Sequence, residues 1–273
     1  MMLGVYEAKT KDGMTVYRSK ISYNGKSVSL GTYETMEGAN GAYNEAKKLY
    51  FDESLNIDEV FLGDSIREGH KGRFLPSDKV VSILNHRDHN IYIKTPIYIR
   101  TGYISYYLKD GREMKFDMDE LFYYSSHRIL KRGESLYVND FGMQYRILDR
   151  YGIHHNSVSG VDYTFVNGDE LDFRSANVIV INRFFGVHRK EEITGKPYYE
   201  TKIHINGDYI IGRYKSDVRA AIAYNKAADY AKEHGLDKEF PQNYVDDISP
   251  REYADVYLDL KLPKKFLEFF SEE

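Results

Sequence analysis

Residues 4–50 and residues 186–234 carry the same pattern of glycines, aromatic residues and small residues, and this internal repeat constrains the fold more than any other feature of the chain. The order and spacing of the matched residues hold across both copies, except that one residue is missing from the second turn. Agreement at so many ordered positions is not expected by chance, so we interpret the two stretches as a duplication. The matched residues are Gly4-Val5 with Gly186-Val187, Tyr17 with Tyr199, Lys20-Ile21 with Lys202-Ile203, Asn24-Gly25 with Asn206-Gly207, Gly31 with Gly212, and Ala42-Tyr43-Asn44 with Ala223-Tyr224-Asn225.

Each copy is predicted to fold into a three-stranded antiparallel sheet followed by one helix. Residues 15–23 alternate in polarity, which is typical of a half-buried strand. Asn24-Gly25 is a strong hairpin signal because both positions tolerate a positive φ. Thr35 can cap a helix that starts near Met36, so the helix covers one face of the sheet and leaves the other free. The covered face is expected to hold Tyr17, Ser19, Ile21, Val28 and Leu30 under Ala39, Ala42, Tyr43 and Ala46 of the helix.

The sheet face away from the helix is the candidate functional surface of each copy. A sheet that presents Arg and Lys can enter a major groove and contact phosphates and base edges. The alternative is a solvated polar face without a ligand, and charge alone leaves both interpretations open. The face is expected to carry Tyr6, Arg18, Lys20, Ser22, Ser27 and Ser29 in the first copy and His188, Glu200, Lys202, His204, Asp208 and Ile210 in the second, flanked by Lys9, Lys11, Lys26, Arg189, Lys190 and Arg213.

The shared pattern of GV, NGK, LGTYxTxExA and AYxxA resembles the Apetala-2/ethylene-response-factor (ERF) DNA-binding domain of plants and its version in bacterial and phage homing endonucleases. The resemblance implies that the sheet lies in the major groove of duplex DNA, where family members use mainly arginines and tryptophans. The chain departs from the family because the arginine-rich first strand and tryptophan are missing, and because Glu200 and Asp208 stand on the expected face of the second copy. The family's sheet-face positions fall on Tyr6, Ala8, Arg18, Lys20, Ser22, Ser27 and Ser29.

The segment between the two copies mixes strand and helix signals. Residues 51–75 are polar and dotted with glycine, which predicts a linker. The later stretches predict a helix over 77–84, strands within 90–100 and 103–118 with Asp110-Gly111 as a turn, a helix near Asp117, and no single element over 135–153.

Residues 161–182, VDYTFVNGDELDFRSANVIVIN, stand directly before the second copy and resemble the core motif of HNH nucleases that carry an Apetala-2-like domain at their C-terminal end. This second resemblance covers residues 97–182 in addition to the repeats. The matching residues are Asn167-Gly168-Asp169, Leu171-Asp172, Arg174 and Asn177.

The departures from the nuclease pattern fall on its chemistry. HNH cleavage needs a histidine that deprotonates water and a divalent metal that polarises the scissile phosphate. Phe165 stands at the position of this histidine, Thr164 at the preceding acid and Phe173 at an asparagine of the motif. We therefore interpret the segment as a degenerate nuclease module with no catalytic residue, no metal ligand and no cofactor.

Two histidine clusters leave alternatives open. One alternative is that His154 or His155 rebuilds a metal site with Asp162, Asp169 or Asp172. The chain would then be an active HNH endonuclease that uses magnesium. The competing interpretation is a turn with exposed histidines. The cluster His86-Arg87-Asp88-His89 has the residue types of metal ligands but is predicted to be a polar turn.

Residues 237–273 match neither family. SPREYADVYLDL predicts a helix with Ser249 as its cap and Pro250 at its first position. Its apolar side, Tyr253, Val256, Tyr257 and Leu260, packs on the body of the protein or, alternatively, serves as a helix for a protein partner or a dimer.

Composition limits the class of protein further. The net charge is −4, so any surface that attracts DNA must be local. Cysteine is absent, which excludes disulfides, thiol nucleophiles and cysteine-ligated metals and fits a reducing cytoplasm. No apolar run approaches the roughly 20 residues of a bilayer span, and no signal peptide is evident, so we expect a cytoplasmic protein with no membrane partner.

The sequence as a whole predicts an α+β protein that binds duplex DNA without cleaving it. The resemblances imply a phage or mobile-element protein derived from an HNH homing endonuclease. A protein-binding inhibitor of a host defence nuclease, similar to an anti-CRISPR protein, and an active metal-dependent endonuclease are the alternatives. The expected segments are an Apetala-2-like domain (1–50), a linker (51–75), an HNH-like module (76–182), a second Apetala-2-like domain (183–236) and a helical tail (237–273). The expected DNA-binding residues are Tyr6, Lys9, Arg18, Lys20, Lys26, Arg189, Lys190, Lys202 and Arg213.

Overall fold

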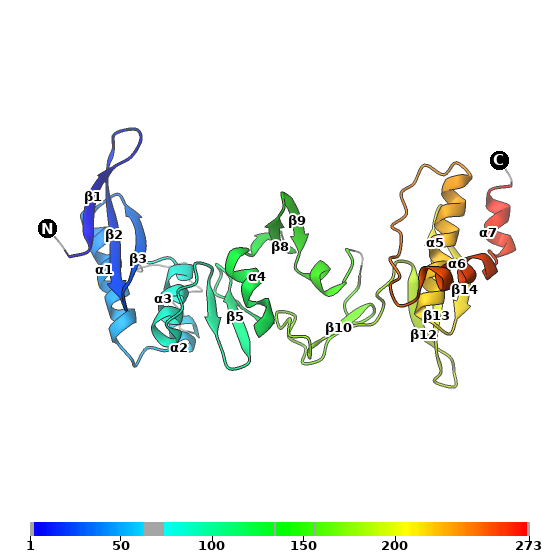
Figure 1. The fold of residues 1–273 in the computed structure, drawn as a ribbon, viewed down its shortest axis with the longest axis horizontal. Coiled ribbons are helices and arrows are strands. Elements are labelled where there is room, and N and C mark those ends of the chain that lie inside the picture. The colour runs from blue at the N-terminus through cyan, green and yellow to red at the C-terminus, as the bar shows by residue number, and fades with distance from the viewer. Residues whose placement is uncertain (1–2, 63–73, 134, 156, 272–273) are drawn as a thin grey trace. The chain divides into compact units, whose positions relative to one another are not determined.

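The computed structural model describes residues 3–62, 74–133, 135–155 and 157–271. Over these ranges the chain is an α+β protein with small antiparallel sheets and short to medium helices (Figure 1). It forms two compact units. Unit 1 comprises Met1–Ile147 and Asn167–Asn177, and unit 2 comprises Leu148–Val166 and Val178–Glu273.

The first copy of the repeat forms a sheet in the order β1-β2-β3, with helix α1 packed against β2 and β3. Asn24 and Gly25 take φ angles of 43° and 74°, so the predicted hairpin turn between β2 and β3 is confirmed. The predicted cap of α1 is also confirmed, because the Thr35 hydroxyl accepts a hydrogen bond from the Gly38 amide at 3.1 Å. The elements are β1 (Val5–Lys9), β2 (Thr15–Tyr23), β3 (Lys26–Tyr33) and α1 (Met36–Phe51).

The second copy forms the same sheet and helix, in the order β12-β13-β14 followed by α5. Both sheets have a register shift at the same place, between Ser19 and Lys20 in one copy and between Thr201 and Lys202 in the other. The two copies therefore share their irregularities as well as their order of elements. The elements are β12 (Val187–Glu191), β13 (Pro197–His204), β14 (Asp208–Tyr214) and α5 (Asp217–Glu233).

A glycine packed under a tyrosine explains why both residues recur in the two copies. Gly4 has a φ of +74°, and a Cβ there would lie 2.3 Å from the Tyr43 ring and 2.6 Å from the Lys20 carbonyl oxygen. Gly186 has a φ of +66°, with the Tyr224 ring and the Lys202 carbonyl each 2.3 Å from such a Cβ. Only glycine fits a left-handed position at this close approach of strand and helix.

The hydrophobic core of the first copy continues into α2 (Ile57–Leu62) and α3 (Ser77–His89). Ile57 and Val60 of α2 are buried in this core, so part of the predicted linker forms a helix with its apolar side turned inward. Residues 63–73, the rest of that segment, lie outside the described residues. Buried residues of α3 that complete the core are Val80, Val81, Ile83 and Leu84.

The prediction that residues 86–89 form a polar turn is wrong, because α3 continues through them and ends where Asn90 takes a left-handed φ of 56°. His86 is 3% exposed and its Nδ1 lies 2.9 Å from the Tyr50 hydroxyl. The rings of Tyr23 and Tyr92 approach the imidazole edge-on. The histidine is therefore part of an aromatic core.

The segment predicted as nuclease-like is divided between the two units. In unit 1, residues 167–177 attach to strand β6 through a parallel bridge between Lys115 and Asp172. The predicted turn at Gly111, with a φ of 82°, and the predicted helix near Asp117 are both confirmed. The elements are β4 (Ile97–Ile99), β5 (Tyr103–Tyr107), β6 (Glu113–Asp117), the 3₁₀ turn η1 (Met118–Glu120), α4 (Leu121–Ser126), β7 (Leu130–Arg132), β8 (Ser135–Asp140) and β9 (Met143–Arg146) in unit 1, and η2 (Leu148–Tyr151), β10 (Tyr163–Phe165) and β11 (Val178–Val180) in unit 2.

The described part of the tail packs on unit 2, which confirms the first of the two interpretations. Helix α6 (Pro250–Asp259) begins with a capping box between Ser249 and Glu252. Leu260 and Phe266, the latter in α7 (Lys264–Phe269), are buried in the core of the second copy. None of the described helices is long and apolar enough to cross a membrane.

We predict that Gly4→Ala lowers the free energy of unfolding by about 3 kcal/mol, because a left-handed alanine costs about 1 kcal/mol and the overlap with Tyr43 and the Lys20 carbonyl adds to it. Gly13→Ala is the matched control, since Gly13 has a φ of +81° but no atom within 4 Å of the position that a Cβ would take. Urea denaturation followed by circular dichroism measures both. Equal losses in the two variants would contradict the packing explanation.

We predict that unit 1 loses stability as the pH falls below about 6.5, in part through His86. Burial lowers the pKa of the His86 imidazole from its ordinary value of 6.5, and the charge of Lys26 adds to this effect. As the pH falls, His86 is therefore protonated in the unfolded chain before it is protonated in the folded chain. This difference lowers the free energy of unfolding by up to about 1.4 kcal/mol per pH unit. His86→Gln should show a shallower loss between pH 7.5 and 5.5 in urea denaturation. Parallel pH profiles for the two proteins would refute this assignment.

Candidate nucleic-acid interface

The open face of the first sheet is arranged as the alternation along β2 predicts. Arg18 and Lys20 are exposed. Ser19 and Ile21, which alternate with them along the strand, are 1% and 4% exposed and face the helix. Tyr6 lies opposite Arg18 on the neighbouring strand and is 46% exposed. The Lys20 ammonium lies 4.7 Å from the centre of the Tyr6 ring, so an aromatic ring and a cation share this face.

The cations of this first face are not neutralised by acids. In the part of the chain that the structure describes, no carboxylate lies within 4.0 Å of the charged groups of Arg18, Lys20, Lys9 or Lys26. The face therefore offers its basic groups directly to solvent.

The second sheet presents its cations differently, around a carboxylate. Glu200 is 1% exposed, and its carboxylate oxygens lie 2.6 Å from Lys190 Nζ, 3.1 Å from Arg213 Nε and 3.6 Å from Lys202 Nζ. Burial alone would raise the pKa of Glu200, but hydrogen bonds from Lys190 and Arg213 and the nearby charges outweigh it and hold the pKa below its ordinary value. We call these four residues the Glu200 cluster.

Two further polar contacts on the second sheet join exposed side chains. Arg189 lies 3.3 Å from Glu191, and His204 lies 2.8 Å from Asp208. The Asp208 carboxylate is open to solvent, unlike that of Glu200. From the sequence, Glu200 and Asp208 are both departures from a DNA-binding face. In the structure, only Asp208 of these two acids exposes its carboxylate to solvent.

The two copies differ by a coordinated exchange at three neighbouring positions. In the repeat, Glu200 takes the place of Arg18, and Arg213 takes the place of Thr32. These residues lie opposite each other in their sheets, Arg18 with Thr32 and Glu200 with Arg213. Lys190 replaces Ala8, so the second copy gains two cations together with the acid that they cover.

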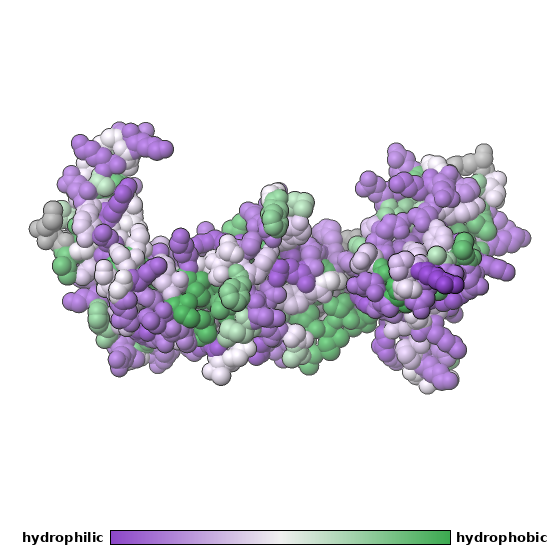
Figure 2. Space-filling view, in the orientation of Figure 1, coloured by the Kyte–Doolittle hydropathy of each residue, from purple (hydrophilic) through white to green (hydrophobic). Residues whose placement is uncertain are grey.

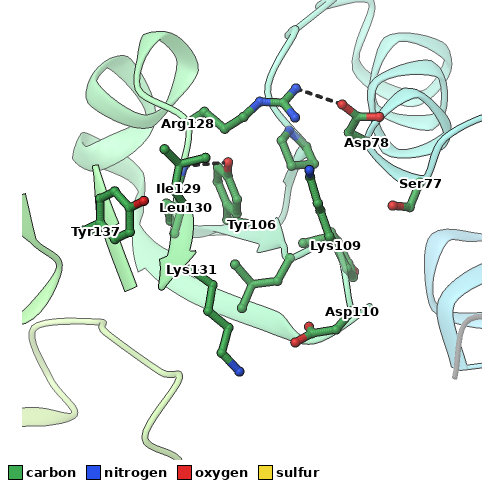
Figure 3. Close-up of a pocket in the computed structure, with 13 residues that line it drawn as sticks. Ser77, Asp78, Tyr106, Lys109, Asp110, Arg128, Ile129, Leu130, Lys131 and Tyr137 are labelled. Carbon is green, nitrogen blue, oxygen red and sulfur yellow. Dashed lines mark hydrogen bonds and ion pairs between the residues drawn. The ribbon is translucent and has the colours of Figure 1, made fainter. Parts of the chain in front are cut away.

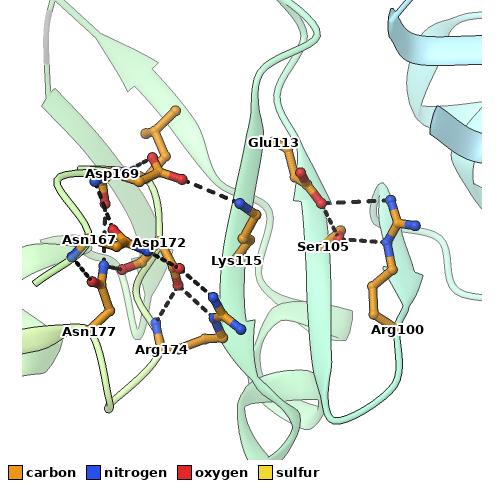
Figure 4. Close-up of polar contacts among 10 residues, drawn as sticks. Arg100, Ser105, Glu113, Lys115, Asn167, Asp169, Asp172, Arg174 and Asn177 are labelled. Carbon is orange, nitrogen blue, oxygen red and sulfur yellow. Dashed lines mark hydrogen bonds and ion pairs between the residues drawn. The ribbon is translucent and has the colours of Figure 1, made fainter. Parts of the chain in front are cut away.

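The residues that match the nuclease motif hold a loop together (Figure 4). Asp172 is fully buried, and its carboxylate accepts bonds from Arg174 at 2.6 and 2.8 Å and from Asn167 at 2.9 Å. Asn177 donates to the Asp172 carbonyl at 2.8 Å, and Asp169 lies 3.4 Å from Lys115 of β6. Burial raises the Asp172 pKa, but the Arg174 bonds prevail and lower it. The carboxylate is thus ionised and fully engaged.

These residues do not fit a magnesium site. Phe165, at the position of the general base, is 8% exposed in β10, and Phe173 is stacked on Phe116. Over the described ranges no three His, Asp or Glu side chains converge as metal ligands would. The Asp172 oxygens are directed to Arg174 and Asn167. We therefore derive no metal-dependent step from this loop.

The histidines proposed to rebuild a metal site have other contacts. His154 Nε2 lies 2.8 Å from the Arg183 carbonyl oxygen, and its ring stacks on Phe185 at 4.0 Å. Asp162 accepts bonds from the Val158 amide and from Asn182. His155 is exposed. The structure does not bring these side chains into one ligand set.

A cavity of about 260 Å³ in unit 1 was not predicted, because its lining comes from segments far apart in the sequence (Figure 3). Its wall is apolar and aromatic, with the Tyr106 hydroxyl accepting a bond from the Ile129 amide at 2.9 Å. Lys109, Lys131 and Arg128 also line it, and Arg128 is held by Asp78 at 2.8 Å. Asp78 and Asp110 line the cavity as well, so its lining carries charges of both signs.

Comparisons with protein-family profiles, with curated proteins and with solved structures found no match. The function is therefore argued from the geometry of the two sheets and of the loop at Asp172.

We predict that Asp172→Asn lowers the free energy of unfolding by about 2 kcal/mol, because the amide cannot accept both Arg174 bonds and leaves a partly buried cation without its partner. Asp169→Asn is the control, since its ion pair with Lys115 is partly exposed and, at 3.4 Å, contributes about 0.5 kcal/mol. Thermal unfolding at fixed pH compares the two. If Asp172→Asn were as stable as wild type, the structural role of this carboxylate would be disproved.

Proposed function

We propose that this protein binds duplex DNA, without cleaving it, through the open faces of its two repeated sheets. The observation that carries the proposal is the first sheet, where Arg18, Lys20 and Tyr6 share one exposed face with no carboxylate beside the cations in the described chain. A helix covers the other face, so the free one is the natural surface for a ligand.

The geometry of a strand suits this role. Residues that alternate along a strand, such as Arg18 and Lys20, stand about 7 Å apart on one face. A β-sheet of this size can enter the major groove, which is about 12 Å wide, and reach phosphates and base edges together. The sheet-and-helix fold of both copies is also what the resemblance to Apetala-2 domains implies, and this agreement supports the proposal.

Two copies on one chain strengthen the binding that each could provide alone. With a net charge of −4, the protein as a whole does not attract DNA, so affinity depends on the local faces. Two weak sites on one chain gain affinity when both engage the same duplex. The proposal that the chain does not cleave DNA is supported by Phe165, which cannot take a proton, and by Asp172, whose carboxylate is engaged with Arg174.

A protein-binding role is the second candidate, and the hairpin of β8 and β9 favours it. Phe141 at its turn is 93% exposed and holds a left-handed φ of 46°, an uncommon conformation for an aromatic residue. Met143 beside it is 56% exposed, and apolar residues gather at this tip in Figure 2. An exposed aromatic tip is a typical contact for a protein partner, which could be a phage or host protein.

We predict that Arg18→Ala/Lys20→Ala weakens binding to a pool of random-sequence duplexes by about a hundredfold, since each of the two lost charge-assisted contacts is worth about 1.5 kcal/mol. The slope of log affinity against log salt should fall by about 1.8 if both residues contact phosphates. Fluorescence anisotropy at several salt concentrations measures both quantities.

The control for this variant is Lys47→Ala/Lys48→Ala, which removes the same charge from exposed positions of helix α1. It should retain most of the affinity. A wild-type chain that forms no complex even at low salt would exclude DNA binding and leave protein binding as the better candidate. Supercoiled plasmid incubated with magnesium or manganese should stay intact.

A further inference from the structure

The carboxylate of the Glu200 cluster belongs to the open face of the second sheet but is buried there under three cations. Glu200 points to the open face of the second sheet, since the neighbouring Thr201 bonds the Ala220 carbonyl of helix α5. It is nevertheless 1% exposed, while Lys190, Lys202 and Arg213 above it are 42%, 31% and 64% exposed. The acid lies beneath its cations, and the cations keep a solvent-facing side.

We propose that the Glu200 cluster is a preorganised site for DNA phosphate groups, in which Glu200 is the positioning residue and the three cations are the phosphate contacts. This inference rests on the proposed function and assigns the second sheet its ligand chemistry. One carboxylate and three cations leave a local charge of +2, so the cluster still attracts an anion.

Free lysine and arginine side chains lose rotamer entropy when a ligand fixes them. Glu200 fixes them beforehand, which removes part of that cost from binding. It also holds three like charges together, which would otherwise separate through repulsion.

The donors that remain are suited to a phosphate. Arg213 uses Nε for Glu200, and its guanidinium lies over the Tyr198 ring at 5.6 Å, which restrains its plane. In the described chain, no carboxylate other than that of Glu200 lies within 4.0 Å of the Arg213 guanidinium or of Lys190 Nζ. A phosphate oxygen on the open side can accept from both residues.

The first sheet has no such device. Its equivalent of Glu200 is Arg18, a cation with no acid beneath it in the described residues, and Thr32 and Ala8 stand where the second copy has Arg213 and Lys190. Preorganisation of the cations by a buried carboxylate is therefore expected in the second sheet and not in the first.

The test compares two charge-neutralising variants of the full chain, Glu200→Gln and Asp208→Asn. Each raises the local charge by one. Asp208 is exposed and positions none of the three cations, so Asp208→Asn should tighten binding to random-sequence duplex. Glu200→Gln should instead weaken it by about tenfold, because a neutral amide no longer holds the cations together. Both are measured by anisotropy in the Arg18→Ala/Lys20→Ala background, where the second sheet dominates.

The outcomes separate this inference from the proposed function. If Glu200→Gln binds DNA as tightly as its parent or more tightly, Glu200 only opposes DNA and the inference is wrong. If the wild-type chain binds no DNA, the proposed function and the inference both fail. If the circular dichroism spectrum shows that Glu200→Gln does not fold, a second pair of variants tests the inference. Lys190→Ala removes one positive charge from the Glu200 cluster, and Lys196→Ala removes one from the adjacent exposed turn. The inference requires that only Lys190→Ala loses several-fold in affinity.

Discussion

The contact between the glycine that directly precedes the first strand and a tyrosine of the helix holds each repeated module together. Gly4 under Tyr43 and Gly186 under Tyr224 bring sheet and helix so close that no Cβ fits between them. The same glycines accept the hydrogen bonds from the Lys20 and Lys202 amides, at 2.9 and 2.7 Å, next to the register shift of each sheet. Because the helix is held on one side, the opposite face of each sheet stays open, and this is where the two copies differ.

That difference shows how one scaffold can carry two electrostatic surfaces. In the first copy Arg18 and Lys20 stand free beside Tyr6. In the second copy an acid enters at the position of Arg18, and cations enter at two neighbouring positions to cover it. The exchange lies on the open face of the sheet, since successive side chains of a strand point to opposite faces.

The loop that resembles a nuclease motif has a structural explanation of its own. Asp172 pairs with Arg174 and accepts from Asn167, and the bridge to Lys115 attaches the loop to β6. These contacts account for the pattern of Asn, Asp and Arg without any reaction. The positions where the chemistry of that motif would require a base or a ligand hold Phe165 and Phe173, which are both buried. The pattern of Asn, Asp and Arg is thus explained by the hydrogen bonds that hold the loop together.

The sequence by itself determined the features that depend on a few neighbouring residues: the duplication, the turn at Asn24-Gly25, the cap at Thr35 and the cap at Ser249 with Pro250 after it. It also identified the exposed alternation of Arg18 and Lys20, because a period of two is visible in one strand. Only the tertiary structure decided that His86 is buried among tyrosines and that Glu200 lies beneath its cations. Burial and ion pairing depend on residues from other strands and helices, and no local pattern records which of them will meet.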